Sequence, residues 1–322
     1  MDRPVADSCE CGGGLVPGCR RRGFSDLQLL EDLAPETLGR LSPDLPTLCD
    51  HLQLLDGVTA ITSGHGAALA VTGRYASPTS VGGAIALPGV ALRYLPGAIS
   101  TALRVAPRTS VHLERPSCAT IDLFDHAGRR VHQTRLASPA DLARLDSVGP
   151  PCPDQELDPA ASAGASEPVR ARPGLDDQID LMDSHLTDSG GARLRTLMGH
   201  DGDHARPVGI WLLSEVLAGV AELGLRPTFT VTSGIQQSHT GPVEAIAHAG
   251  RTLRVRSGHG VLAISTVSIH RMWISQVHGP HGLTPALELF DADGNALVSI
   301  TLTGGHPGAA YRAWDELLTL AE

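Results

Sequence analysis

The sequence is poor in aromatic residues, which make up 3% of its 322 residues. Because hydrophobic residues of all kinds still account for 42%, aliphatic side chains must fill the cores. No hydrophobic run is long enough for a transmembrane helix, and the first residues lack the apolar segment of a signal peptide. The formal net charge of −10 argues against a nucleic-acid partner, which would require a basic face. We therefore expect a cytoplasmic protein without membrane insertion.

Standard catalytic motifs are absent as well. The chain contains no H-E-x-x-H metal motif, no C-x-x-C pair, no G-x-S-x-G nucleophile elbow and no phosphate-binding P-loop. Three of its six cysteines, Cys9, Cys11 and Cys19, cluster in a glycine-rich segment. Their C-x-C spacing, without an obvious fourth ligand, is not that of a standard zinc site. We predict free thiols in a cytosolic chain, and a disordered tail over residues 1–24.

What the chain does contain is an internal repeat. Residues 286–302, ALELFDADGNALVSITL, alternate in polarity on both sides of an Asp/Gly turn, which predicts a β-hairpin. Residues 120–136, TIDLFDHAGRRVHQTRL, have the same pattern. The runs at 58–64 and 228–234 both end in Thr-Ser-Gly and form a second matching pair at a similar separation. Two matches in the same order predict a tandem duplication.

The predicted fold class is therefore α+β, with two copies of a domain that has an antiparallel β-sheet and flanking helices. We expect the first repeat to span residues 25–148 and the second to span residues 175–322. Residues 149–174 are dominated by Pro, Ala, Ser and Gly, a composition that predicts a linker between the repeats.

Histidine is abundant, with 15 residues, and most of these are in the second repeat. A lone histidine is usually solvated or hydrogen-bonded in a core, although histidine is also a common metal ligand and an axial ligand of haem iron. From these motifs alone, the chain would be only a duplicated α+β protein.

The order of several short motifs resembles the bacterial hemin-degrading factor family, also called hemin transport proteins. The first half carries GVTAIT, a Gly-x-Tyr, VALRYL and IDLFDHAGRRVHQTRL, and the second carries QSHTGPVEAI, Trp273, ALELFDADG and HPGAAYRAW. The resemblance spans residues from about Leu41 to Leu320. It implies a cytoplasmic protein of haem and iron utilisation that binds one haem between the two repeats. Haem would be the cofactor and also the substrate if it is degraded, and a membrane haem transporter or a reductase would be a further partner.

The resemblance also implies site residues. The family's axial ligand is a histidine in an Asp-x-His motif at the start of the second half, which His185 fits. Its distal arginine comes from a Leu-Arg strand of the first half, which Arg93 fits as the catalytic residue. Arg193 or Arg195 would bind a haem propionate, and His239 is the second choice of iron ligand.

The sequence departs from the family pattern at several haem-contacting positions. In the family an Arg-Lys-Pro run follows the second-half tryptophan, but here Trp273 is followed by Ile274-Ser275-Gln276-Val277. A Phe-Phe pair after the axial histidine is replaced by Leu186-Thr187, a C-terminal arginine by His306, and a strand histidine by about Ala263. Three functions remain open: haem breakdown, haem carriage, and a degenerate member that acts as a non-enzymatic interaction or regulatory module. The retained axial and distal residues favour haem binding.

Overall fold

The computed structural model describes residues 25–144 and 178–319, with gaps inside both ranges. The predicted tail (1–24), with its three cysteines, and the predicted linker (149–174) lie outside the described residues, so the repeat boundaries stay predictions. In the part of the chain that is described, no helix is long and apolar enough to cross a membrane.

The two halves contain matching series of elements. The first half contains α1 (Asp26–Leu33), β1 (Leu38–Leu41), β2 (Val58–Gly64), β3 (Ala67–Gly73), β4 (Thr79–Val81), β5 (Ala84–Leu87), β6 (Leu92–Tyr94), β7 (Thr101–Val105), β8 (Thr120–Phe124) and β9 (Arg130–Leu136). The second half contains α4 (Gln178–Leu186), α5 (Ala192–Gly199), β10 (Ala205–Val208), α6 (Leu212–Glu222), β11 (Thr228–Thr232), β12 (Ile235–Thr240), β13 (Val243–Ala249), β14 (Thr252–Ser257), β15 (Gly260–Ser265), a 3-10 turn (Thr266–Ser268), β16 (Arg271–Gly279), β17 (Gly282–Phe290), β18 (Ala296–Thr301) and α7 (Gly308–Thr319).

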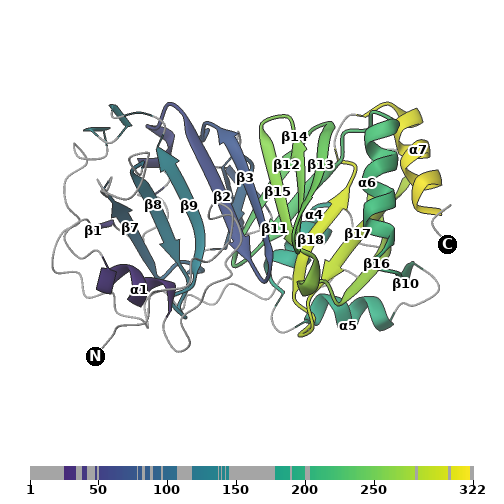
Figure 1. Cartoon of the computed structure of the whole chain (residues 1–322), viewed down its shortest axis with the longest axis horizontal. Helices are drawn as coiled ribbons and strands as arrows, with labels where there is room; N and C mark the ends of the chain where they lie inside the picture. Colours follow the sequence, from purple (N-terminus) through teal and green to yellow (C-terminus); the bar gives the residue numbers. More distant parts are fainter. Residues whose placement is uncertain are drawn as a thin grey trace.

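The strands form two nine-stranded sheets, and each sheet contains strands from both halves. The first sheet has the order β1-β7-β8-β9-β2-β3-β15-β14-β13, and the second has the order β10-β16-β17-β18-β11-β12-β6-β5-β4. Each half therefore keeps six strands and contributes three to the other sheet. Figure 1 shows β13, β14 and β15 of the second half beside β3 of the first. Strand positions correspond one to one, which indicates a pseudo-two-fold relation between the halves.

The two Thr-Ser-Gly runs meet where the halves cross. A Cβ atom on Gly64 would lie 2.4 Å from the side chain of Ser233, so only glycine fits at this position. The residue after it, His65, makes an ion-pair contact with Asp291 in the β17–β18 turn, at 3.4 Å. Residues that the sequence shows as repeated thus pack against the opposite half.

Both predicted hairpins are present, and both are closed in the same way. In β17–β18, the Asp291 carboxylate accepts hydrogen bonds from the backbone N–H groups of Asp293 and Asn295, at 2.9 and 2.8 Å. In β8–β9, Asp125 accepts from the N–H groups of Ala127 and Arg129, at 2.9 Å in both cases. An aspartate that bonds its own turn is the device that the repeated Leu-Phe-Asp sequence predicts.

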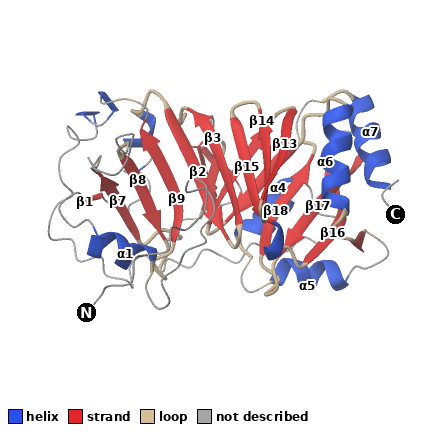
Figure 2. Ribbon diagram, viewed as in Figure 1, coloured by secondary structure: helices blue, strands red, loops and turns tan. Residues whose placement is uncertain are grey.

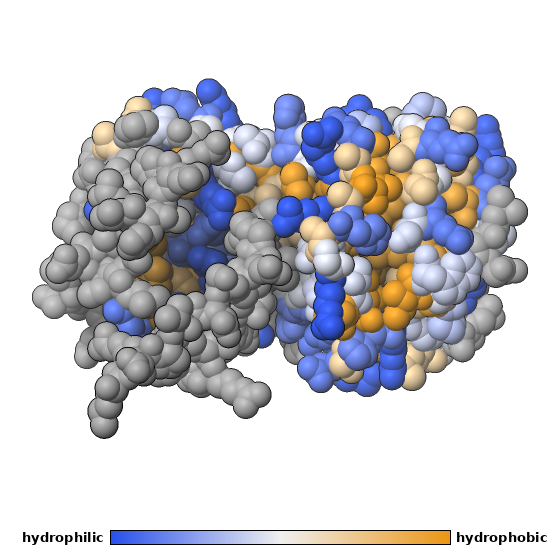
Figure 3. Space-filling view, in the orientation of Figure 1, coloured by the Kyte–Doolittle hydropathy of each residue, from blue (hydrophilic) through white to orange (hydrophobic). Residues whose placement is uncertain are grey.

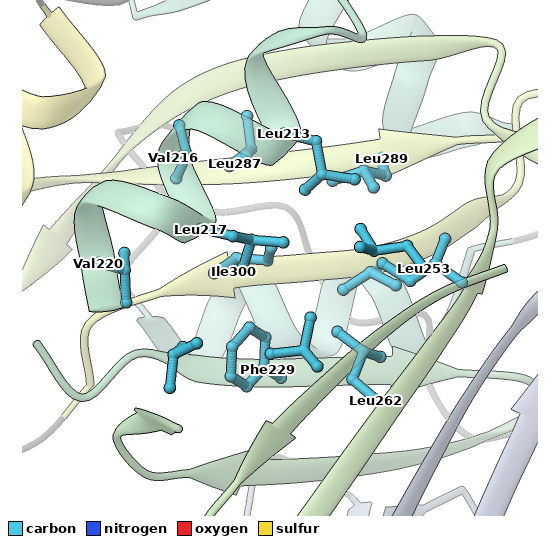
Figure 4. Close-up of a cluster of buried hydrophobic side chains, with 14 of the residues drawn as sticks. Leu213, Val216, Leu217, Val220, Phe229, Leu253, Leu262, Leu287, Leu289 and Ile300 are labelled. Carbon is cyan, nitrogen blue, oxygen red and sulfur yellow. The ribbon is translucent and has the colours of Figure 1, made fainter. Parts of the chain in front are cut away.

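The largest core packs the second sheet against α6, α7 and the strands β3, β14 and β15. Its members are aliphatic, apart from a few aromatic residues such as Phe229 and Trp314. Figure 4 shows Leu213, Val216, Leu217 and Val220 of α6 directed at Leu287, Leu289 and Ile300 of the strands. Figure 2 shows most of the helices over the second half. On the face seen in Figure 3, hydrophobic residues gather over this same part, in patches separated by hydrophilic ones.

The second sheet is buried on both of its faces. Leu287 and Leu289 point into the large core, and the residue between them, Glu288, points to the other face and is fully buried. We call this other face the α4 face, because α4 and α5 cover it. Polar residues on this face are the starting point for the functional site.

Candidate functional site

Helix α4 lies across the α4 face. Its Leu181 packs on Val277 of β16 and Ala286 of β17. The backbone carbonyl of Met182 accepts a hydrogen bond from Nε2 of Gln236 on β12, at 2.9 Å. These contacts place the last turn of α4, which carries His185, over β17.

His185 is directed into the sheet. Its Nε2 atom lies 2.7 Å from Oε2 of Glu288, and the side chains of the two residues are 2% and 0% exposed. The imidazole ring stacks on Phe290, with ring centroids 6.5 Å apart. The histidine that the sequence predicts as an iron ligand is therefore buried and bonded to a carboxylate.

Glu288 accepts hydrogen bonds from two further residues. Arg193 donates from Nε to Oε2 at 2.9 Å and from Nη2 to Oε1 at 2.8 Å, and Ser275 donates from its hydroxyl to Oε1. Burial by itself would raise the pKa of Glu288, but the charge and hydrogen bonds of Arg193, with a smaller contribution from His185, lower that pKa far below its usual range. The carboxylate is consequently ionised and forms a bidentate pair with Arg193.

Helix α5 holds Arg193 in place. The backbone N–H of Arg193 donates to the Asp188 carboxylate at 3.2 Å, and the neighbouring Leu194 and Leu197 pack on Trp273 and Phe290. The buried side of α5 thus presents its arginine to β17.

Arg93 reaches the same sheet from the other half. Strand β6 is one of the exchanged strands, and its Arg93 pairs directly with Gln236 on β12. The guanidinium Nη1 donates to Oε1 of Gln236 at 3.4 Å, and the same glutamine donates to the α4 carbonyl of Met182. Because cross-strand partners face the same side of a sheet, Arg93 belongs to the α4 face. The exchange therefore brings the predicted distal residue to the sheet on which α4 places the predicted ligand.

Hydroxyl groups line the adjacent strands of this face. The side chains of Thr230 and Ser238 are 2.9 Å apart, and those of Thr228 and Thr240 are 2.6 Å apart. All four belong to β11 and β12. The surface between Arg93 and β17 is therefore polar and hydrogen-bonded.

The two remaining predicted residues lie elsewhere. His239 is on the face of β12 opposite to Gln236, where its Nε2 bonds the carbonyl of Ser257 and its ring packs against Gly260. Burial lowers the pKa of His239. Arg195 is exposed on α5, about 200° around the helix from Arg193.

The sequence patterns did not predict that Glu288, Ser275 and Gln236 belong to the site. Strict alternation assigns Glu288 to a solvent face, but helices cover that face and every position of β17 from Thr284 onwards is buried. One signal was present: the matching position of the first hairpin is also a carboxylate, Asp122. It is 2% exposed and accepts a hydrogen bond from Gln133 at 2.8 Å. An acidic residue in the middle of the same strand in both repeats indicates a buried role.

The segment that replaces the family's Arg-Lys-Pro run forms part of the contact with α4. Val277 has no exposed surface and packs under Leu181. An apolar contact thus stands where the resemblance led to the expectation of a cation.

Residues 191–320 match the family model described as the haemin-degrading HemS.ChuX domain. Most of the second half is thus similar to the HemS.ChuX domain. The match includes Arg193 and Glu288, whereas His185 and Arg93 precede it. It confirms the family resemblance that the motif order predicted.

The fold of this chain is similar to solved structures over nearly its whole length. Apo-PhuS, a heme-binding protein from Pseudomonas aeruginosa, is 22% identical with a TM-score of 0.74, over 93% of this chain and 91% of that one. ChuS, an E. coli heme oxygenase, is 16% identical with a TM-score of 0.70, over 92% and 93%. Among curated proteins, no sequence matches. The predicted α+β fold with a tandem duplication is confirmed.

Proposed function

We propose that this protein binds one haem on the α4 face of the second sheet, with His185 as the iron ligand and Arg93 on the distal side, and that it acts in cytoplasmic haem utilisation. The observation that carries this proposal is the strand exchange. It places an arginine of the first half and a buried histidine of the second half over one face. Gln236 bonds Arg93 and the backbone carbonyl of Met182, in the helix that carries His185.

The residue types fit haem. Among the described residues, no group of three or more His, Cys, Asp or Glu side chains could hold a metal ion. A metal held by His185 would therefore need other ligands of its own, and porphyrin nitrogens supply them to haem iron. The imidazole provides the protein ligand, and the hydroxyl-lined strands provide hydrogen-bonding groups beside it.

Each side chain then has a defined task. His185 fixes the iron, and the Arg93 guanidinium donates hydrogen bonds to an anionic or polar group on the distal side. Arg193 is already bonded to Glu288, and Arg195, on the exposed side of α5, is the arginine that we assign to a propionate. Bound haem supplies the redox iron for oxygen chemistry if the protein degrades it. Haem breakdown and haem carriage require the same residues, and adding a reductant in air separates them.

The ligand assignment is tested with His185→Ala and, as a matched control, His239→Ala. Titration of haem should give a saturable Soret band in the wild type and in His239→Ala. It should give no ligand-dependent Soret shift in His185→Ala, because only that variant loses the iron ligand. An unchanged spectrum and affinity in His185→Ala would exclude His185 as the ligand.

The distal role is tested with Arg93→Ala, and Arg104→Ala is the control. Arg104 belongs to a second Leu-Arg pair, which lies on β7 of the first sheet. Arg93→Ala should change the spectra of added sixth ligands, or the rate of haem loss with a reductant, more than it changes haem affinity. Arg104→Ala should change neither. Equal behaviour of the two variants would argue against a distal Arg93.

Two observations favour a second function. The apolar Val277 and the Glu288 contact of His185 suit a degenerate member that binds no haem and acts as an interaction or regulatory module. This alternative predicts no saturable Soret band at any ratio of haem to protein.

A further inference from the structure

The nitrogen of His185 that would bind iron already has a partner. Nε2 is the outer nitrogen of the ring, and it is the atom that lies 2.7 Å from Glu288. The other nitrogen, Nδ1, is next to the Cβ atom, so a planar macrocycle approaching it would meet the histidine's own backbone. Iron and Glu288 therefore compete for one atom.

We propose that Glu288 is a positioning residue that holds His185, and with it α4, against the second sheet until haem iron takes its place on Nε2. This inference rests on the proposed function, in which His185 is the iron ligand. In the closed arrangement Glu288 gives the imidazole a single defined position. In the open arrangement α4 turns its last turn away from β17 and presents Nε2 to the haem.

The carboxylate can release His185 without being left unpaired. Its two oxygens still accept two N–H groups of Arg193 and the hydroxyl of Ser275. A buried carboxylate that loses its only cationic partner strongly destabilises the fold. Here the cationic partner is Arg193, which remains bonded to Glu288 when His185 leaves. His185 can thus leave while Arg193 still balances the charge of Glu288.

Helix α4 packs on the sheet through a smaller apolar cluster than α5 does. Its Leu181 belongs to a cluster with Val277 and Ala286. Helix α5 contributes two leucines to a six-residue cluster that includes Trp273 and Phe290. The apolar cluster that opening of α4 would break is therefore the smaller of the two.

The strength expected of the hydrogen bond between His185 and Glu288 is compatible with reversible opening of α4. A hydrogen bond to a charged group changes an equilibrium constant by about tenfold to a hundredfold. An opening penalty of this size delays haem binding without preventing it. We expect the observed rate of haem association to reach a plateau at high haem concentration, because opening of α4 then limits the rate.

The variant Glu288→Gln tests this inference, with Asp122→Asn as the control because Asp122 occupies the matching buried position in β8. Two measurements are made on the full-length chain: hydrogen exchange of the α4 amides (residues 178–186) without haem, and the plateau rate of haem association by stopped-flow absorbance. Glu288→Gln should raise both by about tenfold, because a neutral amide holds the imidazole more weakly than a carboxylate does. Asp122→Asn should leave both at the wild-type value.

If Glu288→Gln does not fold, because it leaves Arg193 without its carboxylate, the double variant Glu288→Gln with Arg193→Gln removes both charges together. Unchanged α4 exchange and an unchanged plateau in the folded variant, with the haem spectrum intact, would overturn the inference and leave the proposed function standing. A wild type with no Soret band would instead remove the proposed function, and the exchange measurement alone would still decide whether Glu288 holds α4.

Discussion

The residue-scale feature on which this account depends is a buried carboxylate with three partners. Glu288 has no exposed surface, and Arg193, Ser275 and His185 saturate its oxygens. Its counterpart Asp122 is buried beside Gln133 and the more exposed Arg130. The pKa of Asp122 is raised, and burial is the main cause. Both repeats have an acid at this position, and among the described residues a buried arginine and a histidine surround the acid of the second repeat alone.

The two arginines of α5 should differ sharply in their effect on stability. Arg193→Ala leaves Glu288 as an uncompensated buried charge, which should lower the free energy of unfolding by about 3–5 kcal/mol. Arg195→Ala, on the exposed side of the same helix, should change it by less than about 0.5 kcal/mol. Urea unfolding followed by circular dichroism measures both. Similar values for the two variants would show that Arg193 is not the main partner of Glu288.

A second buried residue predicts a dependence of stability on pH. His132 bonds Thr62 and Tyr75, each at 2.9 Å, and burial lowers the pKa of His132 to about 3. In the unfolded chain the pKa of histidine is about 6.5, so below that pH the unfolded state takes up a proton that the folded state does not. This residue therefore stabilises the fold less as pH falls from 6.5 towards 3, by about 1.4 kcal/mol per pH unit.

The variant His132→Gln should remove that contribution. Its free energy of unfolding should be lower than the wild type's at neutral pH, and it should fall less steeply between pH 6 and pH 5. Denaturant unfolding at several pH values gives the two slopes. Parallel slopes for variant and wild type would show that His132 does not stay neutral in the folded protein.

At the scale of single elements, β12 connects the parts of the site. Its Gln236 has no exposed surface and touches both Arg93 and the α4 carbonyl of Met182. The next residue, Gln237, faces the opposite side and donates to the carbonyl of Ala60 at 3.1 Å. Adjacent glutamines on one strand thus serve the two faces of the sheet.

Gln236 and Gln237 allow a matched test of the role of β12. Gln236→Leu should raise hydrogen exchange of the α4 amides and loosen Arg93, because it removes the bonds to both. Gln237→Leu should lower global stability by a comparable amount, about 1–3 kcal/mol for a buried polar contact, without a specific effect on α4. Equal α4 exchange in the two variants would contradict a connecting role for Gln236.

Elements that depend on short-range chemistry could be predicted from the sequence. The Asp125 and Asp291 turns, each closed by its own aspartate, followed from alternation and an Asp/Gly turn. The burial of Glu288 could not be predicted from alternation, because burial of a strand on both faces depends on the helices that cover it. Gln236 and Ser275 were missed for the same reason.

At the scale of the whole molecule, the strand exchange decides how the site is assembled. Strands β4, β5 and β6 complete the second sheet, and β13, β14 and β15 complete the first. The tandem duplication could be predicted from repeated motifs. The exchange could not, because a repeated sequence does not say which copy a strand will pair with. Arg93 was assigned to the site by family resemblance alone, and strand pairing explains how it reaches the second sheet.

The exchange predicts that neither half is stable as a monomer. Residues 175–322 alone would leave β12 without β6 and β15 without β3, with long unpaired edges. We expect this fragment to aggregate, or to dimerise so that the same pairs form between two copies. Size-exclusion chromatography and circular dichroism of the fragment test this. A folded monomer that binds haem as tightly as the full chain would show that the exchanged strands are dispensable.

The most direct test of the central claim is an absorbance titration of the full-length protein with haem. We expect a Soret band that saturates at one haem per chain. A spectrum that stays that of free haem at every ratio would contradict it, and would leave the α4 face with a role other than haem binding.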